Sequence, residues 1–342
     1  MGWRNGVIEE WVGSFRILGV GNRAVNVESE SKDFELNRSM TRQGVSSMEN
    51  DLRSLRLGCV VLVLGCLLHA VAGFSAEPES LEVKAMTFNI RYANPGDGPN
   101  YWGKRREWVA EFIGEQSPDV LGMQEVLKKQ LDFLERRLPD YEWYGVGRDD
   151  GKMAGEYSPI FYKKSRFTRL EQGTFWLSTE PDKIGSRSWD AAITRVCTWV
   201  QLRDRETDRK IFVFNTHFDH RGEVARQESA LLIRKRISES AKQFPWVLLG
   251  DFNTLPGGEV HQRLTRKQAG LVDTLDSYDA PQVKRKGPDS TWCGFKEVRP
   301  GQRIDYIFVP SKAQVLDFEV VLEQRDGRFP SDHLPVVSTI RM

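Results

Sequence analysis

The feature that most constrains this chain is a series of apolar strands that each end in a polar side chain. In LLGDFN, an apolar run leads directly into Asp251 and Asn253, and the alternation of an extended chain places Phe252 on the opposite face. Oxygen and imidazole ligands at strand ends suit a site that holds a hard cation and aims a water at phosphorus. The series comprises FNIRY at Phe88, MQEV at Met123, NTHFDH at Asn215, LLGDFN at Leu248, RIDYIF at Arg303 and SDHLPV at Ser331.

An apolar run between Leu57 and Gly73 precedes these motifs. Arg53 and Arg56 lie before it and Ala70-Val71-Ala72 near its end, which is the layout of a secretory signal peptide. The alternatives are a membrane anchor, for which the run is short, and a lipoprotein signal ending at Cys66. Because a signal peptide is N-terminal, we expect translation to start at Met48. The predicted organisation is a mis-called extension over 1–47, a signal peptide over 48–76 and one domain over 77–342, exported to the periplasm or the medium.

Charge and cysteine content limit the partners of the predicted domain. The chain has 49 basic and 48 acidic residues, a net charge of +1, so no strong basic field attracts long nucleic acid. Cys197 and Cys293 lie in apolar contexts and are interpreted as core residues rather than as a disulfide or metal pair. We expect a monomer without a stable protein partner.

Hydrophobic patterns predict strands and helices that alternate incompletely, which favours mixed sheets covered by helices. On the longest helix, Val224, Leu231, Leu232 and Ile237 are predicted to face one side. The predicted strands are Leu81–Ile90, Ser158–Lys163, Thr194–Leu202, Lys210–Thr216, Trp246–Gly250, Ile304–Val309 and Val336–Arg341. The predicted helices are Lys104–Glu115, Leu127–Leu138, Glu223–Ser240 and Glu259–Thr265.

Asn89 and Glu125 are the first candidate metal ligands. Each follows an apolar strand, and Mg²⁺ prefers a few carboxylate or amide oxygens. Taken singly, the Asn is also typical of a turn and the Glu of a helix start. Asp332 is a further candidate ligand.

Asp251 and Asn253 are candidates for handling water. An Asp can take the proton from a water, and an Asn amide can orient that water or hold a phosphate oxygen. The alternative interpretation is an Asx turn after a strand.

His217 and His333 both stand at strand ends, and imidazolium donors would stabilise the negative charge of a phosphoester transition state. Each would need an acidic partner to fix its tautomer. Asp305 is the candidate partner of His333, and Glu156 that of His217. A satisfied structural histidine is the alternative for each.

Three residues are candidates for substrate binding. Trp102 and Arg105 open a basic, aromatic helix after a Gly/Pro-rich loop, where they could stack on and bind a substrate group. Arg148 in GVGRDDG could contact phosphate. A solvated helix face and a surface turn are the alternatives.

The motifs occur in the order found in the endonuclease/exonuclease/phosphatase superfamily, which the chain resembles from about Val83 to Ile340. This superfamily includes DNase I-like nucleases, sphingomyelinases, inositol polyphosphate phosphatases and deadenylase-like exoribonucleases. The resemblance implies a four-layer α/β/β/α sandwich, two packed mixed sheets flanked by helices, with the site at the strand ends. The residues that carry it are Asn89, Glu125, His217, Asp251, Asn253, Asp305, Asp332 and His333.

The resemblance also implies roles for these residues. Glu125 matches the principal Mg²⁺ ligand, with Mn²⁺ as the alternative ion, and Asp251 matches the residue that activates water. Asn89 and Asp332 match residues beside the metal, and Asn253 matches the residue that orients the water. His217 and His333 match the phosphate-binding and acid pair. Their acidic partners are Glu156 for His217 and Asp305 for His333. Leu127 departs from the Arg of DNase I-like enzymes at that position, and the YWGKRR helix start is closer to the deadenylase and nocturnin branch.

The predicted function is hydrolysis of a phosphoester by an Asp-activated water with Mg²⁺. The substrate class stays open between nucleic acid, with 3′–5′ exoribonuclease-like activity, and a small or lipid phosphoester. A catalytically silent binding module on the same fold is the alternative. A glycoside hydrolase would explain Asp251 and Glu125 but would leave both histidines without a role.

Overall fold

The computed structural model describes residues 80–266, 270–276 and 284–342. One compact unit extends over Ala76–Met342. The predicted extension and signal peptide, residues 1–47 and 48–76, lie outside the described residues. Among the helices of the described part, none is long and apolar enough to cross a bilayer.

The first sheet has eight strands in the order β10-β13-β14-β1-β2-β4-β3, with β12 paired to β14. It is mixed, because β1 runs parallel to β2 and antiparallel to β14. Its strands are β1 Glu82–Asn89, β2 Val120–Gln124, β3 Tyr141–Tyr144, β4 Ile160–Lys163, β10 Lys284–Lys286, β12 Gln314–Val315, β13 Asp317–Val320 and β14 Val336–Arg341.

The second sheet has six strands in the order β5-β6-β7-β8-β11-β9. It is also mixed: β7 and β8 are parallel, and β11 is antiparallel to β8, with Asp305 opposite Asp251 in register. Its strands are β5 Phe167–Trp176, β6 Val196–Asp204, β7 Lys210–His217, β8 Trp246–Asp251, β9 Leu271–Asp273 and β11 Asp305–Pro310.

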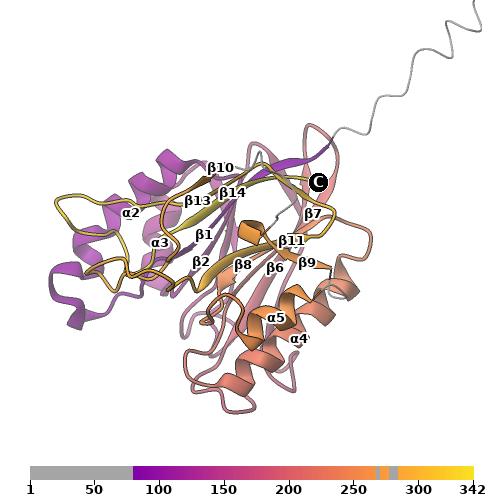
Figure 1. The fold of residues 1–342 in the computed structure, drawn as a ribbon, viewed down its shortest axis with the longest axis horizontal. Coiled ribbons are helices and arrows are strands. Elements are labelled where there is room, and N and C mark those ends of the chain that lie inside the picture. Colours follow the sequence, from indigo (N-terminus) through magenta and orange to yellow (C-terminus); the bar gives the residue numbers. More distant parts are fainter. Residues whose placement is uncertain (1–79, 267–269, 277–283) are drawn as a thin grey trace, which may run out of the picture. The chain divides into compact units, whose positions relative to one another are not determined.

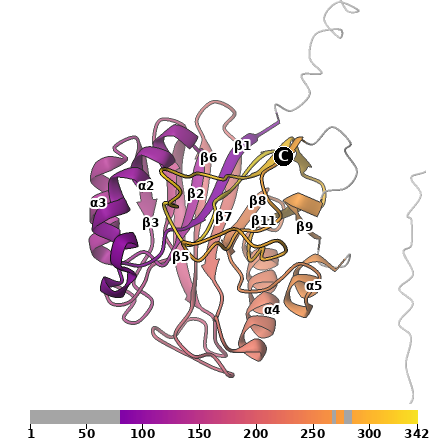
Figure 2. The same cartoon turned by 60° about the vertical axis from the view of Figure 1, so that its left-hand side comes forward.

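Alternation along the strands divides their side chains between a central and an outer core. In β1, Val83 and Ala85 enter the core between the sheets, whereas Met86 and Phe88 pack beneath the helices of the first sheet. Helices α2 and α3 cover that sheet, and α4 and α5 cover the second (Figures 1 and 2). The predicted four-layer sandwich is confirmed. The helices are α2 Trp102–Gln116, α3 Lys128–Arg137, α4 Glu223–Ser240 and α5 Glu259–Thr265, with 3-10 turns at η1 Pro95–Asn100 and η3 Thr274–Asp276.

The buried face of α4 differs from the predicted one. Val224 and Leu231 are 48% and 39% exposed, so the predicted apolar face is wrong for these two residues. Small side chains on the inner face let the helix lie close to the sheet. The buried residues of α4 are Ala225, Ser229, Ala230, Ile233 and Ile237.

Asn215 of β7 joins the two sheets, two residues before the end of this strand at His217. Its amide nitrogen donates to the carbonyls of Met123 (2.8 Å) and Pro159 (2.9 Å), and its oxygen accepts from Gln124 Nε2 (2.7 Å). Gly122 makes room for this contact, because a Cβ there would lie 2.6 Å from Asn215 Oδ1. A fully hydrogen-bonded buried amide fixes one alignment of the two sheets.

Cys197 and Cys293 are both free and buried, so their interpretation as core residues is confirmed. Burial raises the pKa of Cys293 to about 12. Neither thiol is therefore a nucleophile at neutral pH.

Candidate active site

The polar strand ends predicted from the sequence meet at one edge of the two sheets. The parallel pairs β1/β2 and β7/β8 bring their carboxyl ends to this edge, and the antiparallel strands β11 and β14 bring their starts. The residues surround a cavity of about 410 Å³. Its lining is Arg91, Tyr92, Glu125, Glu156, Ile193, Arg195, His217, His220, Asp251, Asn253, Trp292, Ile304, Asp332 and His333.

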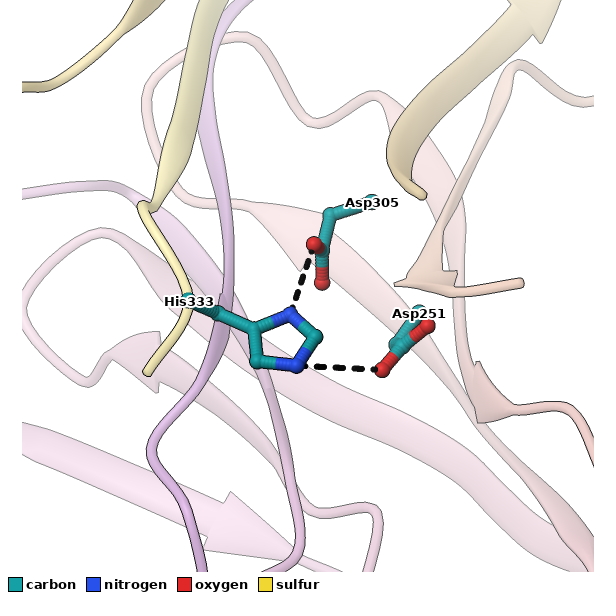
Figure 3. A group of neighbouring side chains, drawn as sticks. All are labelled: Asp251, Asp305 and His333. Carbon is teal, nitrogen blue, oxygen red and sulfur yellow. Dashed lines mark hydrogen bonds and ion pairs between the residues drawn. The ribbon is translucent and has the colours of Figure 1, made fainter. Parts of the chain in front are cut away.

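His333 lies between two buried carboxylates (Figure 3). Its Nδ1 is 2.9 Å from Asp305 Oδ2, and its Nε2 is 3.8 Å from Asp251 Oδ2. One ligand atom from each of the three residues lies within 4.8 Å of the others. The predicted partnership of Asp305 with His333 is present, and it directs Nε2 toward Asp251.

The pKa values of Asp251 and His333 suit proton transfer. Burial and the charge of Asp305 raise the pKa of Asp251 to about 7, which is the range of an effective general base at neutral pH. Burial lowers the pKa of His333, but Asp305 and Asp251 outweigh it and raise that pKa well above the usual value. The pair therefore combines a carboxylate that can accept a proton with an imidazolium that can donate one.

Asn253 connects this group to His217. Its backbone N–H donates to Asp251 Oδ1 at 3.0 Å, and its amide nitrogen is 3.1 Å from His217 Nε2 and donates to the Phe218 carbonyl. An amide nitrogen is a donor, so His217 Nε2 accepts and the ring is neutral. The amide oxygen of Asn253 is then the acceptor available to a water.

The expectation of two imidazolium donors is wrong for His217. Burial first, and then the nearby Arg195, hold its pKa well below the usual value. Its Nδ1 is buried and has no hydrogen-bond partner among the described residues. Of these two histidines, His333 is therefore the one that is positively charged at neutral pH.

The predicted pairing of Glu156 with His217 is also absent. Glu156 instead accepts two hydrogen bonds from Arg148, at 2.7 and 3.1 Å. Such a bidentate ion pair is stronger than a single bond to a neutral imidazole. The guanidinium of Arg148 is engaged by this ion pair. Arg148 lines a small pocket beside the main cavity and is not part of the lining of the main cavity. The prediction of Arg148 as a phosphate contact is corrected accordingly.

Glu125 and Asp332 form the carboxylate side of the cavity. Burial and the charge of Glu125 raise the pKa of Asp332. The Arg91 guanidinium lies 3.8 Å from each of the two carboxylates and is bonded to Asp97. Glu125 and Asp332 repel one another and attract the positive charge of Arg91. Two such carboxylates are a donor set that fits Mg²⁺.

Asn89 is oriented differently from the prediction of a metal ligand. Its oxygen accepts the backbone N–H of Arg91 at 3.0 Å, while its amide nitrogen donates to Glu125 (3.2 Å) and Asp251 (3.0 Å). In this orientation it presents no oxygen to a cation. Instead, it holds the carboxylate of the metal side against the carboxylate of the base.

The model of the endonuclease/exonuclease/phosphatase family matches residues 86–333, which includes every residue of this group. The chain belongs to the endonuclease/exonuclease/phosphatase family. The predicted resemblance and the prediction of a phosphoric ester hydrolase are both confirmed.

Solved structures of family members are similar along nearly their whole length. An endonuclease/exonuclease/phosphatase from Bacteroides vulgatus is 39% identical, with a TM-score of 0.72 over 76% of this chain and 98% of that one. A mannosyl-6-phosphatase from Bacteroides thetaiotaomicron is 34% identical, with a TM-score of 0.70 over 75% and 99%. The catalytic domain of human nocturnin, 20% identical with a TM-score of 0.60 over 76% and 94%, shows the same fold. The chain covers 34% to 59% of the length of the first curated relatives it matches.

Two residues predicted to bind substrate are structural in this family member. Trp102 is 6% exposed and packs edge-on against Phe133. Arg105 is 1% exposed and donates to four backbone carbonyls, and burial lowers its pKa to about 10. The basic, aromatic pattern of this helix start reflects a buried anchor for the surrounding loops.

Seven residues of the cavity wall were not predicted as site residues: Arg91, Tyr92, Ile193, Arg195, His220, Trp292 and Ile304. Arg91 and His220 stand inside motifs that were recognised, FNIRY and NTHFDH, so their proximity to Asn89 and His217 was a usable signal. Arg195 and Trp292 lie in loops outside the recognised motifs, so no motif in the sequence indicated that they are part of the site.

The backbone at the site is strained. Arg91, Glu125 and Asn253 have positive φ angles of 57°, 62° and 47°. Non-glycine residues in this conformation cost of order 1–3 kcal/mol and cluster at functional sites. Here the strain places side chains from both sheets around one cavity.

Proposed function

We propose that this chain hydrolyses a small phosphomonoester with a divalent metal ion, Mg²⁺ or Mn²⁺, and a water activated by Asp251. The observation that carries the proposal is the group of Asp251, His333 and Asp305 in Figure 3, with a carboxylate of pKa about 7 next to a charged imidazole. Asp251 takes the proton from the water, and Asn253 Oδ1 orients that water toward phosphorus. His333 stabilises the negative charge that develops on the phosphoryl oxygens and protonates the leaving oxygen.

Glu125 and Asp332 are the residues that would hold the metal. When bound there, the ion would supply Lewis-acid stabilisation of the phosphoryl oxygens. Asn89 keeps Glu125 close to Asp251 through its two hydrogen bonds. The neutral His217 positions Asn253, since its Nε2 accepts from the Asn253 amide.

A small substrate is favoured over a nucleic acid. The cavity volume of about 410 Å³ lies toward the small end of the range of about 300–1,000 Å³ for small-molecule pockets. The net charge of +1 offers no extended field for a polyanion. The similar mannosyl-6-phosphatase points to a sugar phosphate as the first compound to test.

We also propose that the protein is exported, on the evidence of the apolar run between Leu57 and Gly73 and the small residues near its end. N-terminal sequencing of the protein recovered from a bacterial host would test this. A mature start near Glu77 is expected. Recovery of peptides from residues 1–47 in the exported protein would overturn the expected start at Met48.

Hydrolysis by the full chain with Mg²⁺ tests the reaction, measured as inorganic phosphate released from monoesters and as cleavage products of diesters. The panel is mannose 6-phosphate, inositol phosphates, sphingomyelin, and single-stranded RNA and DNA, with Asp251→Asn and EDTA as controls. We expect release from a phosphomonoester that both controls abolish. Cleavage confined to RNA or DNA would replace the small substrate by nucleic acid. Silence across the panel together with loss of Mg²⁺ binding would favour a silent binding module.

A further inference from the structure

Trp292 is the exposed aromatic side chain of the cavity wall. It is 37% exposed, and its backbone pairs with that of His333 in an isolated bridge. Tyr92 also lines the cavity, but the Arg91 guanidinium lies over its ring at 4.5 Å. Trp292 therefore offers the wall a large apolar surface directly beside His333.

Gly294 makes room for the indole of Trp292. It has a φ of +57°, and a Cβ there would lie 3.0 Å from Trp292 Cζ2 and 3.2 Å from Cη2. The six-membered ring of the indole thus packs on the backbone of Gly294. The contact leaves the rest of the indole surface for a ligand to stack on, since Trp292 is 37% exposed.

His220 supplies a hydrogen-bond donor to the same cavity. Its Nδ1 lies 3.2 Å from Arg195 Nη2, and because a guanidinium only donates, Nδ1 accepts and the ring proton is on Nε2. Burial and the charge of Arg195 lower the pKa of His220, so the ring stays neutral at neutral pH. Its Nε2–H can donate to a hydroxyl group.

Arg195 supplies unused donors behind His220. It is 4% exposed, and its Nε and Nη1 have no hydrogen-bond partner among the described residues. Asp219 lies nearby, with Oδ2 at 3.8 Å from Nε. Arg195 belongs to the cavity lining, and a guanidinium suits an anionic oxygen of the substrate.

We propose that Trp292 and His220 bind the leaving group of the substrate, and that this leaving group is a single hydroxylated ring, as in a hexose phosphate. The inference rests on the proposed function and specifies its substrate class. A pyranose has C–H bonds on one face, which match one indole surface, and hydroxyls at its edge, which match His220. A nucleobase is commonly stacked between planar groups on both sides, whereas here the Tyr92 ring is covered by Arg91.

The test compares substrates with and without a ring. The full chain, Trp292→Ala, Trp292→Phe and Tyr101→Ala are assayed with mannose 6-phosphate, glycerol 3-phosphate and adenosine 5′-monophosphate. Tyr101 is the control, because it is 39% exposed and is not part of the cavity lining. We expect Trp292→Ala to lower the ratio of kcat/KM for mannose 6-phosphate over glycerol 3-phosphate about tenfold, or 1.4 kcal/mol. Phe should restore most of the ratio and Tyr101→Ala should keep it.

His220→Ala should raise KM for mannose 6-phosphate severalfold with little change in kcat, because it removes a contact with the ring and not with the reacting phosphate. An equal loss on both substrates in Trp292→Ala, or none, would overturn the inference. So would a wild-type preference for adenosine 5′-monophosphate that depends on Trp292.

Failure of the proposed function gives a different result. If the wild type hydrolyses no phosphoester, calorimetric titration of mannose 6-phosphate into the full chain decides the inference separately. Binding that Trp292→Ala weakens about tenfold would keep the ring site on a catalytically silent protein. Absence of binding would overturn the ring site as well.

Discussion

Replacement of Asp219 by Asn should destabilise the fold by about 3 kcal/mol at pH 7. Asp219 is 2% exposed and joins the loop before β6 to the loop before α4. Its Oδ1 accepts the N–H groups of Arg221 (2.9 Å) and Gly222 (2.7 Å), and its Oδ2 those of Ala192 (3.1 Å) and Ile193 (3.2 Å).

The magnitude follows from these four bonds. An Asn keeps one oxygen, so two N–H groups would face an amide nitrogen and stay unpaired, at about 1–3 kcal/mol each. The charge gives a second route to a similar value. Burial opposes ionisation of Asp219, yet the N–H donors lower its pKa from 3.8 to about 2. That difference corresponds to about 2 kcal/mol of stability from the ionised form.

Urea unfolding followed by circular dichroism measures the effect. A depressed carboxyl pKa stabilises the fold above the unfolded pKa and loses this contribution as pH falls from about 4 toward 2. The difference between the wild type and Asp219→Asn should thus be equal at pH 7 and pH 5 and smaller at pH 3. Asp208→Asn, on a side chain that is 85% exposed, is the control and should change stability by less than about 0.5 kcal/mol. A loss below about 1 kcal/mol for Asp219→Asn, or one that grows on acidification, would refute the reasoning.

Four further substitutions test the site and its support. Asp251→Asn should lower kcat at least about 10³-fold at unchanged Tm, and unchanged phosphate release would remove it as the base. His333→Ala should lower kcat at least about 10²-fold, and wild-type turnover would contradict its role as donor. Glu125→Gln should weaken Mg²⁺ binding about tenfold by calorimetry; an unaltered titration would move the ion to the group of Figure 3. Arg105→Met should cost about 3 kcal/mol or more in urea unfolding, because it leaves four carbonyl contacts unmade. The exposed neighbour in Arg106→Met is the control, and equal effects of the two would show that the buried bonds contribute little.

The sequence predicted several elements with a pronounced apolar pattern. The bounds of β14 and α4 agree residue for residue with the predicted Val336–Arg341 and Glu223–Ser240. Seven strands of the described residues were not predicted, β3 and β5 among them. Both lie at the ends of their sheets, and their half-exposed residues leave no apolar run to recognise.

The predicted residues at strand ends meet at one cavity, whereas Trp102, Arg105 and Arg148 do not line it. Strand-end position is a property of the sequence, and it brought Asp251, Asp305 and His333 together. Glu156 pairs with Arg148, eight residues before it, rather than with His217, and this outcome depends on how the segment between the two residues folds. The burial of Arg105 likewise depends on loops that enclose it, the carbonyl of Pro330 among them.

The cross-link made by Asn215 divides what this protein can change from what it must keep. The reacting groups lie at or beside the ends of strands, and the hydrogen bonds of Asn215 fix the alignment of these strands between the two sheets. By contrast, His220 and Trp292 lie in loops that connect the helices and strands. Insertions and exchanges in those connections alter the shape offered to a ligand without moving the strand ends. New substrate preferences can therefore arise on this scaffold through loop replacement alone, while the machinery for water attack is inherited unchanged.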